Sequence, residues 1–227
     1  MKDKVALGLY ACISALILGN EFIANQWLGW IVKPFMMPAL ILVFTSDKLY
    51  EKTSNKLQLI VALIFSWGGD VLLMLTGKYP ILFIAGLVSF LIAHVFYISI
   101  FAASLQQLAQ LRFIGWKATP ALLYIAVLLS ILIPALQQHP ASGILTPSIL
   151  AYALVIGTML LTALNRKVAS TSSYRWVLVG AVLFVLSDSM IAINRFVSPF
   201  AGAGFAIMST YLVAQYMIVK GHLKSSE

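Results

Sequence analysis

Three long stretches without a charged side chain constrain the fold of this chain more than any other feature. No Asp, Glu, Lys or Arg occurs in residues 79–111, 118–165 and 196–219. A helix needs about 20 mostly apolar residues to cross a hydrocarbon core of about 30 Å. Of the 227 residues, 61% are apolar and 10% are charged, whereas a soluble domain is about 45–50% apolar and about 25% charged. The sequence therefore predicts an integral membrane protein with several spans.

Charged residues, prolines and glycines divide the apolar sequence into eight candidate spans. Membrane β-strands would be short alternating segments, but these runs are apolar all round. We therefore predict an all-α, polytopic membrane helix bundle that forms a single membrane domain over residues 1–227. The first run is expected to be a retained helix and not a signal peptide, since no small-residue cleavage site follows it. The predicted spans are 5–24, 31–47, 57–76, 80–104, 116–136, 146–164, 175–194 and 200–220.

The basic residues fall mainly on one side of the predicted membrane. The other side holds Lys78 and Arg195. Because short cytoplasmic loops retain positive charge, both termini are expected in the cytoplasm, with a bacterial inner membrane as the expected location. The net charge of +8 then belongs to separate short loops beside an anionic leaflet. No contiguous basic patch indicates nucleic-acid binding, and the oligomeric state is not indicated. The cations on the cytoplasmic side are Lys2, Lys4, Lys48, Lys52, Lys56, Arg112, Lys117, Arg166, Lys167, Arg175, Lys220 and Lys224.

The two halves of the chain resemble each other faintly. The third span contains Gly69-Asp70 and the seventh contains Ser187-Asp188. The span that follows each of them carries a glycine and then polar groups at helical spacing. Two parallel four-helix repeats would give this pattern, and so would chance similarity among apolar helices. Both interpretations stay open at the level of sequence.

Asp70 and Asp188 are the candidate catalytic residues, because they are the acids that we place within spans. A carboxylate at the bilayer centre costs about 2.5–3.5 kcal/mol on insertion scales, so such residues are retained mainly for function or pairing. Both lie about seven residues from the same end of their spans, hence at a depth of about 10 Å. The other acids are assigned to loops or ends: Asp3, Glu21, Asp47, Glu51 and Glu227.

Two carboxyl groups in one poorly solvated site are expected to take different roles. One keeps its proton and the other is ionised near neutral pH, which yields a proton donor beside an anion. A structural role is the simpler alternative. Each Asp would then only bond backbone or serine groups, such as Ser66 one turn before Asp70 or Ser187 beside Asp188.

Lys33, His94, Tyr97, Tyr211 and Gln215 are the remaining candidate pocket residues. Lys33, just inside the second span, would pair with an Asp, bind a lipid phosphate or extend to the interface. His94 shares a helix face with Tyr97 and lies about 21 Å from the end of its span nearest the aspartates. That depth argues against a direct role of His94 in their chemistry. Tyr211 and Gln215, four residues apart, would line the cavity or bond another helix.

Metal and nucleophilic chemistry have no sequence signature in this chain. A multi-histidine zinc site is not expected from three histidines. The G-x-S-x-G elbow of a serine nucleophile is also missing from the sequence. We therefore expect no metal or other cofactor.

Taken together, these residues resemble the motifs of the lysoplasmalogenase (YhhN-like) family over nearly the whole chain. The resemblance implies hydrolysis of the vinyl ether bond of a lysoplasmalogen, a lysophospholipid, to a fatty aldehyde and glycerophosphoethanolamine or glycerophosphocholine. It implies that Asp70 and Asp188 are catalytic. The motifs are Lys33-Pro34, Gly69-Asp70, Gly86-x-x-Ser89-Phe90-x-x-x-His94-x-x-Tyr97, Ser187-Asp188 and Tyr211-x-x-x-Gln215.

The implied reaction suits a pair of carboxyl groups. Protonation of the β-carbon of a vinyl ether gives an oxocarbenium ion that water captures, and the hemiacetal then collapses. This requires a carboxylic acid as proton donor and a carboxylate that stabilises the cation or activates water. The hydrocarbon chain would lie among the apolar spans and membrane lipids, and Lys33 or a loop cation would hold the phosphate.

Other function classes stay open. A proton-coupled transporter would use the two aspartates as a relay, with helices broken around them, and Gly68-Gly69 before Asp70 is compatible with such a break. A metal-dependent hydrolase of the ceramidase type is disfavoured by the number of histidines. A noncatalytic assembly factor would have no need of two buried acids at matching depth.

Overall fold

Helices make up the fold in the computed structural model, which describes residues 2–79, 81–103, 115–166 and 170–226. No strand occurs in these ranges, and the predicted all-α class is confirmed. The α-helices are α1 (Lys2–Ile23), α2 (Gln26–Val32), α3 (Met36–Ser46), α4 (Lys56–Met74), α5 (Leu82–Ala102), α6 (Gly115–Gln137), α7 (Ser142–Asn165), α8 (Thr171–Phe196) and α9 (Ala203–Leu223). Short 3-10 turns are η1 (Lys33–Phe35), η2 (Tyr50–Lys52) and η4 (Lys224–Ser226).

The apolar sequence explains why the chain forms helices, because a segment in lipid must satisfy its own backbone hydrogen bonds. Seven of the described helical segments are long and apolar enough to cross a membrane, so the chain is an integral, multi-pass membrane protein. α9 is not among the seven, and polar side chains such as Gln215 and His222 lie buried on it. It packs along α8 more extensively than any other helix pair of the described chain. We therefore interpret α9 as the eighth membrane helix.

The second predicted span, 31–47, corresponds to a longer helical segment, Gln26–Ser46. Lys33 lies in the 3-10 turn between α2 and α3, and so deeper in the segment than its sequence position suggested. Pro38 has no N–H to offer the carbonyl oxygen of Pro34. The indole N–H of Trp67 donates to this oxygen instead (Nε1···O 2.8 Å), so a polar neighbour satisfies the freed backbone group.

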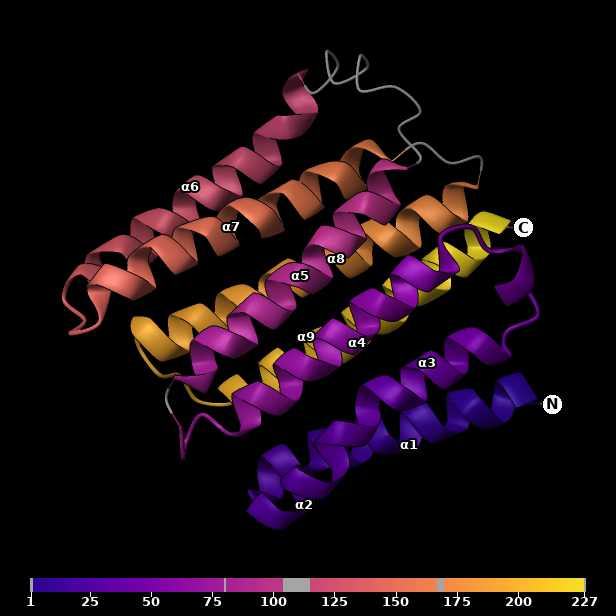
Figure 1. Ribbon diagram of the computed structural model, residues 1–227, viewed down its shortest axis with the longest axis horizontal. Coiled ribbons are helices and arrows are strands. Elements are labelled where there is room, and N and C mark those ends of the chain that lie inside the picture. The colour runs from indigo at the N-terminus through magenta and orange to yellow at the C-terminus, as the bar shows by residue number, and fades with distance from the viewer. Residues whose placement is uncertain (1, 80, 104–114, 167–169, 227) are drawn as a thin grey trace.

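Two tightly packed helix pairs, α4 with α5 and α8 with α9, form the centre of the bundle (Figure 1). α1 to α3 lie on one side of them, and α6 and α7 lie on the other. Of the cations counted for the orientation, Arg112 and Lys167 lie outside the described residues. The orientation itself stays a prediction.

Helix contacts in the first half of the chain recur in the second. α1 packs on α3 as α6 packs on α7, and α3 packs on α4 as α7 packs on α8. Tyr97 and Gln215 are 118 residues apart, and the same separation relates Asp70 to Asp188. The arrangement is compatible with two parallel four-helix repeats, which stay a prediction.

Two glycines let α5 approach α4 closely. A Cβ atom at Gly69 would lie 2.5 Å from the ring of Phe90, and one at Gly68 would lie 2.9 Å from the Ser89 hydroxyl. Small residues at such positions allow close packing of membrane helices. α4 is continuous over Lys56–Met74, and α8 over Thr171–Phe196. The helix breaks that the transporter alternative needed at the aspartates are therefore not found in these two described helices.

Candidate active site

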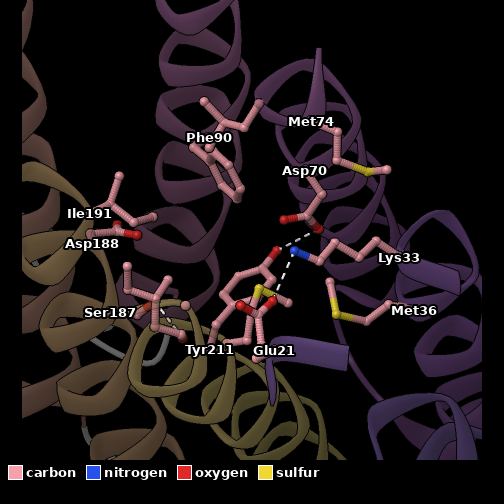
Figure 2. Close-up of a pocket in the computed structure, with 14 residues that line it drawn as sticks. Glu21, Lys33, Met36, Asp70, Met74, Phe90, Ser187, Asp188, Ile191 and Tyr211 are labelled. Carbon is pink, nitrogen blue, oxygen red and sulfur yellow. Dashed lines mark hydrogen bonds and ion pairs between the residues drawn. The ribbon is translucent and has the colours of Figure 1, made fainter. Parts of the chain in front are cut away.

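A cavity of about 240 Å³ contains both candidate catalytic residues at the end of the bundle where α4 ends. Asp70 lines it from α4 and Asp188 from α8, on opposite walls (Figure 2). Much of the remaining wall is apolar. Its apolar side chains are those of Met36, Leu73, Met74, Phe90, Ile191, Ile207 and Met208. The cavity thus combines two carboxyl groups with a surface suited to a hydrocarbon chain.

Asp70 is held by a chain of buried hydrogen bonds. The Tyr211 hydroxyl donates to its Oδ2 (2.9 Å). Nε2 of Gln215 donates to the Tyr211 oxygen (3.3 Å) and to the Ser66 hydroxyl (3.1 Å), while Tyr97 donates to Gln215 Oε1 (2.6 Å). Because the Tyr211 oxygen already accepts from Gln215, its single proton is directed at Asp70. Tyr97 and Gln215 support Tyr211 from behind and are not among the residues that line the cavity.

Asp188 contacts two side chains that the sequence did not connect to it. The Tyr152 hydroxyl donates to Oδ2 (2.8 Å), and Nε2 of His94 lies 3.3 Å from the same oxygen. Nδ1 of His94 lies 2.6 Å from the carbonyl oxygen of Phe90. A carbonyl oxygen only accepts, so Nδ1 carries a proton and Nε2 is directed at Asp188. A hydrogen bond between Nε2 and the carboxyl oxygen then requires a second proton, because both atoms otherwise only accept.

The inference from depth that separated His94 from the aspartates was wrong. Asp188 lies eight residues before the end of α8, and His94 lies twelve residues after the start of α5. These positions correspond to about 12 Å and about 18 Å of helix. The difference is about one helical turn, which the two side chains span.

Each candidate carboxyl group is contacted by a residue from the other half of the chain. Asp70, in the first half, accepts from Tyr211 in the second. Asp188, in the second half, faces His94 in the first. The site is therefore built between the two halves of the chain.

Glu21 also lines the cavity. It lies in the last turn of α1, at the end of the span as predicted, but its side chain was not expected to take part in the site. Its carboxylate pairs with Lys33 (Oε1···Nζ 3.2 Å), and both side chains are largely shielded, at 18% and 28% exposed. An aspartate was considered from the sequence as the ion-pair partner of Lys33, and in the structure the partner is Glu21.

Among the residues that the structure describes, no group of three or more His, Cys, Asp and Glu side chains is placed to bind a metal ion. The three histidines lie apart. His94 faces Asp188, His139 packs on Phe196, and His222 contacts the backbone at Ser54. The chemistry that this site offers is acid–base catalysis by two carboxyl groups.

Comparisons with known proteins place the chain in a family. The sequence model of the YhhN family matches residues 28–222. Human lysoplasmalogenase TMEM86A is 32% identical over 174 residues, which is 75% of this chain and 67% of the human protein. Human lysoplasmalogenase TMEM86B is 32% identical over 72% of this chain, and the match covers 62% of that protein. A lysoplasmalogenase of Mycobacterium tuberculosis is 28% identical over 96% of this chain and 79% of its own length. No solved structure matches the chain.

Proposed function

The chain belongs to the YhhN family, and on this premise we propose that it is a lysoplasmalogenase that hydrolyses the vinyl ether bond of lysoplasmalogens. The observation that carries the proposal is the pair of carboxyl groups, Asp70 and Asp188, on opposite walls of one largely apolar cavity. The relatives named lysoplasmalogenase, at 28–32% identity, support the same reaction. The products are a fatty aldehyde and a glycerophospho-alcohol.

The contacts of the two carboxyl groups support a division of roles. Asp188 receives a hydrogen bond from Tyr152 and faces the imidazole of His94. The proton donated by Tyr152 and the proton that His94 and Asp188 share both stabilise negative charge on this oxygen, so we assign Asp188 as the ionised partner. Asp70 receives one hydrogen bond, from Tyr211. The nearby ammonium of Lys33 is engaged by Glu21, which leaves Asp70 to keep its proton and act as the acid.

The reaction begins with transfer of the Asp70 proton to the β-carbon of the vinyl ether. The double bond is consumed, and the resulting oxocarbenium ion is stabilised by the Asp188 carboxylate. Water adds to the carbon attached to oxygen and yields a proton, which restores the acid. Collapse of the hemiacetal then breaks the carbon–oxygen bond to glycerol and releases the aldehyde. No electrons are gained or lost overall, and one water is consumed.

The substrate is oriented by the contrast between the cavity walls. The hydrocarbon chain lies against apolar side chains such as Phe90, Met208 and Ile191. Lys33 at the cavity edge holds the phosphate, as a lysine ammonium commonly does. His94, Tyr97 and Gln215 act on the substrate through Asp188 and Tyr211, because they lie behind these residues.

The direct test is release of fatty aldehyde from an alkenyl lysophospholipid by the purified, detergent-solubilised protein. The matched control lipid has a saturated ether, which has no double bond to protonate. We expect aldehyde and glycerophospho-alcohol in equal amounts from the first lipid and neither from the second. A pure, folded protein that releases no aldehyde from alkenyl lipids would refute the proposed function.

A further inference from the structure

A second cavity, of about 290 Å³, adjoins the one that holds the aspartates. The two share three lining residues, Glu21, Lys33 and Met74. The Glu21–Lys33 ion pair therefore stands at their junction. The two cavities differ in polarity on either side of this pair.

The second cavity has a more polar lining than the first. The side chains of Asn20, Asn25 and Gln26 line it together with Trp30. Its walls come from the end of α1, the start of α2 and the end of α4. Helix ends lie at the boundary between hydrocarbon and water, where lipid headgroups also lie. An amphipathic lipid with its chain in the first cavity would thus have its headgroup in the second.

The ion pair at the junction has both charges that a zwitterionic headgroup needs for recognition. Resting on the function proposed above, we propose that the second cavity is the headgroup subsite, and that Glu21 binds the ammonium of a phosphate–ammonium headgroup. When the lipid binds, Lys33 leaves Glu21 and pairs with the phosphate, and Glu21 pairs with the ammonium of the headgroup. Each of the two largely shielded charges keeps an opposite partner throughout, so no unpaired charge remains at the junction.

An anionic headgroup lacks this match. A lysophospholipid with a bare phosphate would take Lys33 and leave Glu21 shielded, unpaired and beside another negative charge. Glu21 is therefore a specificity-determining residue that selects against anionic lipids by charge. It lies outside residues 28–222, the part of the chain matched by the family model.

The test measures binding, so that it does not depend on hydrolysis. The probes are two saturated-ether lysolipids, 1-alkyl-glycerophosphoethanolamine and 1-alkyl-glycerophosphate, titrated onto the solubilised protein and followed by native mass spectrometry. The readout is the ratio of the two affinities. We expect Glu21→Gln to lower the preference for the ethanolamine lipid about tenfold, as the loss of a charge-assisted contact predicts. Glu51→Gln is the matched control, since Glu51 pairs with Lys56 at the other end of α4, is 81% exposed and should leave the ratio unchanged.

Asn25→Asp is a second, independent variant. The Asn25 side chain caps α2 by accepting from the N–H of Leu28 (3.2 Å), and Asp caps equally well. It adds a negative charge to the cavity wall, so the preference for the ethanolamine lipid should rise. This variant decides the question if Glu21→Gln does not fold.

The headgroup assignment is overturned if the affinity ratio stays at the parent value in both folded cavity variants. If Glu21→Gln does not fold, an unchanged ratio in Asn25→Asp alone overturns it. Either result holds even if the protein hydrolyses lysoplasmalogen. A ratio that shifts as expected upholds the subsite, even if the parent releases no aldehyde. In that case only the proposed reaction fails.

Discussion

Replacing either aspartate by asparagine is the sharpest test of the paired-acid site. Asp70→Asn removes the proton donor, and Asp188→Asn removes the anion. Each should lower turnover at least about a hundredfold, the low end for general acid–base catalysis. A hundredfold loss corresponds to about 2.7 kcal/mol of activation free energy.

The contacts around each aspartate predict that the fold tolerates these changes. At position 70 the amide oxygen still accepts from Tyr211. At position 188 the contacts of Tyr152 and His94 fall on one oxygen, so the amide oxygen still accepts from Tyr152 and faces Nε2 of His94. At position 188, replacing a charged acceptor by a neutral one weakens a hydrogen bond by about 1 kcal/mol, and at position 70 one neutral acceptor replaces another. The loss in rate should therefore greatly exceed any loss in stability.

The assay is aldehyde release by purified variants, with thermal unfolding and helical content measured on the same samples. Asp47→Asn is the matched control, because Asp47 pairs with Lys220 (2.9 Å) away from the cavity. The double variant should be little worse than the poorer single one, since groups that act as a unit are not additive. Parent turnover should also slow in heavy water. If either folded variant works at nearly the parent rate, that Asp is structural and the mechanism must be abandoned.

Three further outcomes follow from the packing, the charge distribution and the ligand groups. Gly69→Ala should lower the free energy of unfolding by about 1–3 kcal/mol through overpacking, since its Cβ would meet the ring of Phe90. The control Gly8→Ala has open space around the new Cβ and should leave stability unchanged. Equal melting temperatures of the two variants would contradict the close-packing argument. A reporter active only in the cytoplasm should be active after Glu227 and silent in the 137–146 loop, whereas the reverse result would invert the topology. Chelators should leave aldehyde release intact, and loss that zinc restores would show that a metal is needed.

The architecture followed from the sequence because one physical requirement governs it. Uncharged runs of this length must form helices in lipid, and each predicted span overlaps a helix of the described chain. Helix ends were harder to predict. Lys33 lies deeper than predicted because the second helical segment begins at Gln26. The place of Glu21 at the cavity was missed because an acid near the end of a span was expected to face water, whereas Glu21 pairs with Lys33.

The site was predictable in its acids and not in its neighbours. Asp70 and Asp188 stand out because carboxylates within spans are rare. Tyr152 gave no signal, since a tyrosine in an apolar run is as compatible with packing as with a hydrogen bond to an acid. The contact between His94 and Asp188 depends on how two helices lie against each other, and counting residues along each helix separately did not reveal it.

The contacts of the two aspartates have a consequence for how the site is assembled. Asp70 accepts from Tyr211 on α9, and Asp188 faces His94 on α5. Neither carboxyl group therefore has these neighbours until the first and second halves of the chain have packed together. A chain that ended before α9 would leave Asp70 without its hydrogen-bond donor, so the acids reach their working arrangement only when the last helix is in place.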